Sequence, residues 1–166
     1  MVTMICSHCN SKMTAQKPGR YHYVESGLTN IYLKGMAVWS CPQCGGEEIE
    51  IPDPAGLQSA IGRVLVSKES RLTGKEFRFL RTYLGHSGAD IAARFAVSRE
   101  TVSRWETGAL KVPGPADVAL RYMVLMGKAN HDYKVTDLND IMESRRRIKC
   151  LEAKFHNKWK IENKSA

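Results

Sequence analysis

Four cysteines, arranged as two CxxC pairs, are the residues whose types and spacing most clearly predict chemistry in this sequence. Cys6 and Cys9 lie in "CSHC", and Cys41 and Cys44 lie in "CPQCGG". A CxxC pair on a tight turn separates two thiolates by about the width of a zinc ion, and two such turns complete a tetrahedral site with Zn–S bonds of about 2.3 Å. Four protein ligands close the coordination sphere, so we expect one structural Zn²⁺ per chain and no catalytic metal.

Two other interpretations of the CxxC pairs are a redox motif and two disulfides. A redox motif would need a βαβ context, which this sequence does not show. Disulfides are rare in the cytosol, where we expect this protein because its first residues lack the apolar core of a signal peptide. His8, inside the first pair, could replace one of the cysteines. Cys150 has no cysteine to pair with and is expected to be an incidental thiol.

The stretch "AVSRETVSRWETG", residues 96–108, predicts a short amphipathic helix. Ser98 is a typical N-cap, Gly108 is typical of the position after a helix, and Pro113 prevents continuation. At about 100° per residue, an arc of about 140° holds Arg99, Glu100, Ser103, Arg104 and Thr107. The opposite side carries Thr101, Val102 and Trp105. We therefore expect one buried face and one polar face.

The polar face has the chemistry for reading DNA bases. Arginine can bind guanine O6 and N7 together, and glutamate accepts a hydrogen bond from cytosine N4. Ser98 and the helix N-terminus would suit a phosphate. The alternative is a solvated helix on which Glu100 and Arg104 form an ordinary i, i+4 ion pair. A preceding helix predicted at 87–96, joined by a short turn, favours a helix-turn-helix and DNA binding.

The net charge of +8 is unevenly distributed along the chain. Residues 1–56 carry four Lys/Arg and five Asp/Glu, whereas residues 57–166 carry twenty-one and twelve. A basic second part predicts a polyanionic partner, for which double-stranded DNA is the usual case and an anionic membrane the less usual one. No apolar run is long enough to span a bilayer. No phosphate loop, nucleophile motif or carboxylate pair indicates an enzyme.

The sequence predicts an α+β protein made of two small domains. Residues 1–50 have the pattern of a zinc-ribbon β domain, with strand-like runs at 21–25, 31–35 and 36–40. Residues 51–56 contain two prolines and a glycine and are interpreted as a linker. Residues 57–130 are predicted to be all-helical, with Thr73 as an N-cap. Residues 131–166 are predicted to be a basic helical extension, because apolar residues recur there every three to four positions.

Residues 87–115, "SGADIAARFAVSRETVSRWETGALKVPGP", resemble the Xre/Cro-type, lambda-repressor-like helix-turn-helix, including its "VSRxTVSRWExG" core. In that family a buried ion pair ties the first helix to the end of the recognition helix. The resemblance implies this structural role for Arg81 and Glu106, beside a buried Trp105. Two positions depart from the family. Gly88 replaces a DNA-contacting Gln, and Ala96 replaces a turn Gly, at a cost of about 1–2 kcal/mol if its backbone is left-handed.

Over residues 4–126, the order of parts resembles the MqsA/YgiT-type antitoxins, as does the pattern "YxY…GLxNIYLKGMxVWxCPQCG". The resemblance implies a homodimer that binds a palindromic operator, represses its own operon, and holds a toxin, an mRNA-cleaving RNase, through the zinc domain. Arg104 matches the family's base-reading Arg, whereas Glu100 stands where the best-known members have Asn. Motif and resemblance together give these expected DNA contacts: Ser87, Ser98, Arg99, Glu100, Ser103, Arg104 and Lys111.

Two other functions remain open. One is a stand-alone transcription regulator without a toxin, and the other is an adaptor whose helix-turn-helix binds only protein. The aromatic residues of the zinc domain could form a partner interface or simply its core; they are Tyr21, Tyr23, Tyr32 and Trp39. For the DNA-binding function we expect a cytoplasmic, nucleoid-associated location.

Overall fold

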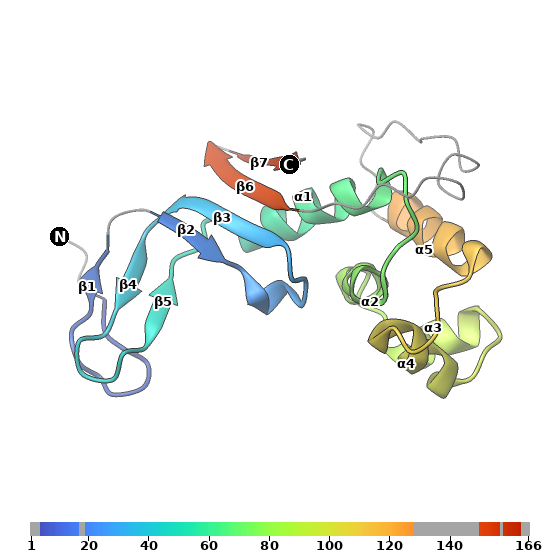
Figure 1. The fold of residues 1–166 in the computed structure, drawn as a ribbon, viewed down its shortest axis with the longest axis horizontal. Coiled ribbons are helices and arrows are strands. Elements are labelled where there is room, and N and C mark those ends of the chain that lie inside the picture. Colours follow the sequence, from blue (N-terminus) through green and yellow to red (C-terminus); the bar gives the residue numbers. More distant parts are fainter. Residues whose placement is uncertain (1–3, 17–18, 128–149, 157, 164–166) are drawn as a thin grey trace.

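The computed structural model describes residues 4–16, 19–127, 150–156 and 158–163 (Figure 1). The chain forms a mixed α/β fold, in which the described residues make five α-helices and two sheets. The first part comprises β1 (Thr14–Ala15), β2 (Gly19–His22), a 3-10 turn η1 (Val24–Ser26), β3 (Ile31–Met36), β4 (Val38–Ser40) and β5 (Glu47–Ile49). The rest comprises α1 (Pro54–Val66), α2 (Gly74–Tyr83), α3 (Gly88–Arg94), α4 (Arg99–Thr107), α5 (Gly114–Gly127), β6 (Leu151–His156) and β7 (Lys158–Asn163).

The strands form two sheets that separate between β3 and β4. The smaller sheet has the order β1-β4-β5 and is antiparallel. The larger has the order β2-β3-β6-β7, in which β6 runs parallel to β3 and the other pairs are antiparallel. The strands predicted at 31–35 and 36–40 are present as β3 and β4, whereas the run 21–25 divides between the end of β2 and η1.

The predicted basic C-terminal helix is wrong where the structure describes that segment. Residues 151–156 and 158–163 form the antiparallel strands β6 and β7, and the rest of the predicted extension, apart from Cys150, lies outside the described residues. The apolar spacing that suggests a helix also fits strand alternation in β7, where Trp159 is buried between the exposed Lys158 and Lys160. In β6, Leu151, Glu152 and Ala153 are all buried. Pairing of β6 with the edge of β3 overrides the local pattern.

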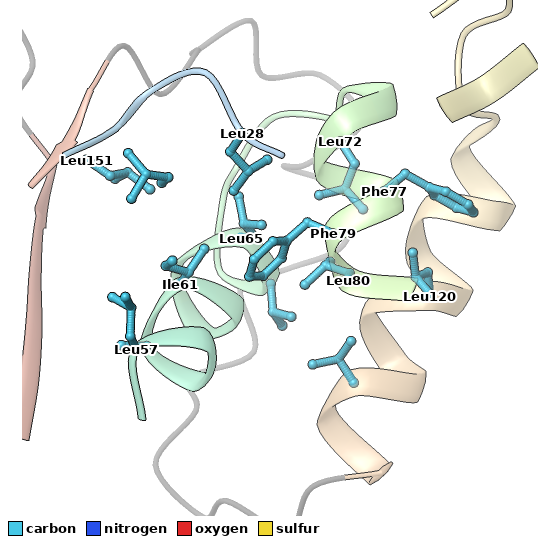
Figure 2. Close-up of a cluster of buried hydrophobic side chains, with 14 of the residues drawn as sticks. Leu28, Leu57, Ile61, Leu65, Leu72, Phe77, Phe79, Leu80, Leu120 and Leu151 are labelled. Carbon is cyan, nitrogen blue, oxygen red and sulfur yellow. The ribbon is translucent and has the colours of Figure 1, made fainter. Parts of the chain in front are cut away.

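One hydrophobic core joins the larger sheet to the helices (Figure 2). Leu28 from the loop before β3 and Leu151 from β6 pack in the same cluster as Ile61 of α1 and Leu80 of α2. A second, separate cluster around Cys6 belongs to the smaller sheet. Side chains from residues 1–50 therefore contribute to two separate hydrophobic clusters.

Specific hydrogen bonds hold the segment 51–56, which the sequence predicts to be a linker. α1 begins at Pro54, inside the range 51–56, and Asp53 caps it by accepting a hydrogen bond from the Gly56 amide at 2.9 Å. The Trp159 indole N–H donates to the carbonyls of Pro52 and Asp53, at 3.1 and 2.9 Å. The C-terminal hairpin thus holds the chain where the strands lead into the helices.

The helices begin where the sequence predicts capping residues. Thr73 caps α2 in a capping box with Glu76, which confirms the predicted N-cap. Ser87 and Asp90 form the same arrangement at α3. α4 packs against both α2 and α3, so its position depends on two other helices. Within the part of the chain that the structure describes, no helix is long and apolar enough to cross a membrane.

Candidate metal centre and nucleic-acid interface

The four predicted cysteines converge on one point beside the smaller sheet. Their Sγ atoms all lie within 4.8 Å of one another, with Cys6 to Cys44 at 3.5 Å and Cys9 to Cys41 at 3.4 Å. Zn–S bonds of about 2.3 Å in a tetrahedron place the sulfurs about 3.8 Å apart, so the spacing fits a bound metal. All four cysteines are free thiols, and neither His8 nor Cys150 belongs to the cluster. Cys150 instead lies 2.9 Å from Arg20 Nη2.

The two CxxC turns have matching backbone conformations. Asn10 follows Cys9 with φ 56°, and Gly45 follows Cys44 with φ 70°, so both turns pass through the left-handed region. The Asn10 and Gly45 amides donate to the carbonyls of Cys6 and Cys41, each at 3.0 Å. Glycine and asparagine tolerate this conformation better than other residues, which explains their presence after each pair. The local sequence therefore folds each pair into a ligand turn.

Electrostatics within the cluster favour a bound cation. Hydrogen bonds from Ser11 lower the pKa of Cys9 to about 6. The Gly46 backbone also acts to lower the pKa of Cys44, but the sulfurs of Cys6, Cys41 and Cys9 raise it to about 12. Four thiolates this close together would repel one another, and a bound divalent cation would offset that repulsion. The donor set thus fits a closed structural metal site and leaves no open position for catalysis.

Glu48 is a supporting residue that sequence reasoning missed. Its carboxylate accepts a hydrogen bond from the Ser7 amide at 2.8 Å, inside the first cysteine turn. This bond is the main reason that the pKa of Glu48 is lowered. The residue reaches Ser7 because β5 pairs with β4. The sequence contains no signal for this pairing beyond a short acidic run.

The second candidate site is the exposed face of α4. Val102 and Trp105 are buried against the helical core, as predicted, and the Trp105 ring meets Phe77 edge-on at a centroid distance of 5.7 Å. The opposite face lines a shallow surface hollow of about 530 Å³ with Arg99, Glu100, Ser103 and Arg104. The structure thus brings together the four predicted base-reading side chains and exposes them all.

The beginning of α4 sets the charge state of this face. Ser98 caps the helix by accepting from the Thr101 amide at 3.1 Å. Hydrogen bonds with its own backbone amide and with Ser98, together with the nearby Arg99 charge, lower the pKa of Glu100. Glu100 is therefore an anionic hydrogen-bond acceptor at neutral pH, between two arginines that act only as donors.

The predicted ion pair between Arg81 and Glu106 is present. Arg81 Nε and Nη2 donate to the two carboxylate oxygens at 2.5 and 3.2 Å, and Arg81 Nη1 donates to the His86 carbonyl at 2.6 Å. Both side chains are nearly buried, at 13 % and 12 % exposed. The pair ties α2 to the end of α4 and so fixes the angle at which the polar face is presented.

The remaining predicted contact residues lie outside the α4 hollow. Ser87 uses its hydroxyl to cap α3 by accepting from the Asp90 amide at 3.1 Å, and Lys111 is exposed in the loop after α4. Among the aromatic residues of the strand region, Tyr23 is buried and the other three are half-buried. This burial matches a core role for Tyr23 and leaves part of each remaining ring at the surface.

The turn between α3 and α4 carries strain that a substitution should relieve. Ala96 has φ 52°, and the Val97 amide donates to the Ala92 carbonyl at 3.0 Å, which is the Schellman arrangement that usually has glycine at this position. Ala96→Gly is expected to raise the free energy of unfolding by about 1 kcal/mol. Urea unfolding followed by circular dichroism measures this. The matched control, Ala93→Gly inside α3, should lower the free energy of unfolding by about 0.5–1 kcal/mol. The strain argument would be contradicted if Ala93→Gly raised the free energy of unfolding, or if Ala96→Gly did not raise it.

The chain therefore presents two sites, a four-cysteine cluster and a polar helix face, on opposite parts of the fold (Figure 1). Comparisons with protein-family models, with curated proteins and with solved structures find no match for this chain.

Proposed function

We propose that this protein binds double-stranded DNA sequence-specifically, with α3 and α4 as a helix-turn-helix and α4 as its recognition helix. The observation that carries the proposal is the division of α4 into a buried apolar side and an exposed side bearing Arg99, Glu100, Ser103 and Arg104. An isolated α-helix fits the major groove, which is about 12 Å wide. The fixed attachment of α4 to α2 and α3 supports the same role, because base reading needs a rigidly presented helix.

Each exposed group on α4 has a partner in the major groove. The two arginines can bind guanine O6 and N7, and the Glu100 carboxylate can accept from cytosine N4. Ser98 and the positive end of the helix dipole suit a phosphate, and Lys111 and Ser87 would contribute further contacts to the DNA backbone. Base contacts would set the sequence, and phosphate contacts would set the position on the duplex.

The wider biological role extends the same proposal. Two copies, as a homodimer, would place their α4 helices in successive major grooves about 34 Å apart on a palindromic operator. By the resemblance to MqsA/YgiT-type proteins, this dimer is the antitoxin of a toxin–antitoxin pair and the repressor of its own operon. The four-cysteine cluster then holds one structural Zn²⁺, and the surface around it holds the toxin. This activity belongs in the cytoplasm, at the nucleoid.

Arg104→Ala and Arg99→Ala are each expected to weaken operator binding by about 1–3 kcal/mol and to relax preference at one base pair. Each change removes a bidentate base contact while leaving the buried side of α4 intact. The measurement is a fluorescence-anisotropy titration on a selected binding sequence and on random DNA of equal length. Arg71→Ala, at an exposed arginine outside the α4 face, is the matched control and should keep the preference. An equal loss on both DNAs would remove the base-reading role.

The antitoxin role can be tested by co-expressing this protein with the product of the adjacent gene. Expressing that gene alone and with this chain, while following growth and co-purification, separates the two regulatory functions. Toxicity relieved through a stable complex supports the antitoxin. If the adjacent gene encodes a harmless protein that does not co-purify with this chain, the result supports a stand-alone regulator. DNA binding is then still tested by the titration described above. An adaptor would show no DNA affinity, whereas a DNA binder loses affinity steeply as salt rises.

A further inference from the structure

A cleft between the strand region and the helices takes no part in the proposed function. It encloses about 940 Å³, a volume typical of small-molecule sites, which span about 300–1,000 Å³. Its walls come from residues 25–27, the first two turns of α1, one side of α2 and the last residues of α4. It is separate from the cysteine cluster and from the α4 hollow, since it shares no lining residue with either.

The walls of the cleft are held in place by buried contacts. Tyr23 and Leu28, on either side of the 25–27 loop, are both in the main core. Gln58 Nε2 donates to the Tyr23 hydroxyl at 3.3 Å, which links this loop to α1. At the other side, Gly74 of α2 packs so closely on α4 that an added Cβ would lie 2.1 Å from the Trp105 carbonyl oxygen. The cleft is therefore preformed, as binding sites for small molecules usually are.

The α2 wall of the cleft carries two cations, Lys75 and Arg78. Lys75 and Arg78 lie one turn apart, and the Arg78 side chain is 70 % exposed. Arg78 Nε forms a long ion pair with the Glu106 carboxylate at 3.9 Å, and this carboxylate is held more closely by Arg81 Nε and Nη2. The Glu25 carboxylate on the facing loop accepts the Tyr21 hydroxyl at 2.6 Å. An anion in the cleft would therefore be attracted to the α2 wall.

Next to these cations, two aromatic side chains of α2 line the cleft. Phe79 and Tyr83, one turn apart on α2, stack with an interplanar angle of 6° and a centroid distance of 6.4 Å. Phe79 is buried, at 6 % exposed, and Tyr83 is half-buried. Such a surface favours a planar apolar group by stacking and by removal of apolar area from water. The cleft thus offers two kinds of contact side by side.

We infer that this cleft binds a small organic anion, in which a planar ring lies along Phe79 and Tyr83 and one carboxylate or phosphate lies against Lys75 and Arg78. Arg78 supplies the geometry for this, because a guanidinium binds either group through two parallel hydrogen bonds. The Glu25 side of the cleft disfavours a second negative charge. The inference concerns binding alone and does not depend on DNA recognition by α4.

The test is isothermal titration of the full-length, metal-loaded chain with two anionic probes and their neutral counterparts. Indole-3-acetate is compared with indole-3-acetamide, and adenosine monophosphate with adenosine, so each pair differs only in the anionic group. At least one anion is expected to bind, at least about tenfold more tightly than its neutral counterpart. The two pairs also show whether a carboxylate or a phosphate is preferred.

Arg78→Gln should weaken the bound anion about tenfold, whereas Arg71→Gln, which removes an equal charge outside the cleft, should leave it unchanged. Both substituted side chains are exposed, so both variants should stay folded, which circular dichroism checks. Binding of neither anion by the wild-type chain, equal binding of the neutral compounds, or equal losses in the two variants would each overturn the inference.

Discussion

Removing the metal from the four-cysteine cluster is expected to unfold the β1-β4-β5 sheet while the helices stay folded. The hydrophobic cluster there is small, with Cys6, Met13 and Cys41 buried and Met4 and Trp39 packed beside them. So small a cluster buries too little apolar surface to offset the entropy of ordering the chain. Structural Zn²⁺ in zinc-finger peptides contributes about 10–16 kcal/mol to folding, and the proposed ion would supply stability of this order here.

Cys41→Ser is the substitution that tests this dependence. It should lower the metal content from one Zn²⁺ per chain to far less, and amide NMR signals of residues 4–15 and 38–49 should lose their dispersion. Signals from α1 to α5 should change little, because these helices belong to the other core. Cys150→Ser is the matched control and should keep the metal, since Cys150 is outside the cluster. Full dispersion after chelation would show that the sheet folds without metal.

Arg121→Met is expected to lower the free energy of unfolding by about 3–5 kcal/mol, the usual cost of breaking a buried charge pair. Arg121 is 2 % exposed and Asp117 is 1 % exposed, and the Arg121 Nε donates to Asp117 at 2.6 Å. The same guanidinium donates to the carbonyls of Val66, Lys68 and Ser70 at 2.6–3.0 Å, and thus holds the turn between α1 and α2. Methionine fills similar volume but leaves these oxygens and the carboxylate without a donor.

Chemical unfolding of three variants distinguishes this network from a general effect of losing an arginine. Arg71→Met, at an exposed position, should stay within about 0.5 kcal/mol of the unsubstituted chain. Asp117→Leu with Arg121→Met should recover part of the loss, because no buried charge is then unpaired. The carbonyls and the Leu72 amide, which donates to Asp117 at 2.8 Å, still lack partners in that double variant. A loss below 1 kcal/mol for Arg121→Met would show that water reaches this turn.

Local residue patterns determined much of what the sequence predicts about this protein. Two residues between paired cysteines suffice to bend each pair into a ligand turn. Thr73 and Ser98 sit at helix starts because their hydroxyls satisfy amides within the next turn. The division of α4 into two faces follows from helical spacing alone. Each of these features depends on residues within one or two turns of the chain, so no knowledge of the fold is needed.

Only the tertiary structure decided the rest, because it depends on segments that are distant in sequence. The C-terminal spacing is compatible with a helix and with a strand, and the free edge of β3 selects the strand by pairing Ile31 with Leu151. The support that Glu48 gives the first cysteine turn, the carbonyls gathered by Arg121, and the cleft beside Arg78 all require elements brought together by packing. A long-range contact leaves no fixed spacing in the sequence, so a local pattern cannot predict it.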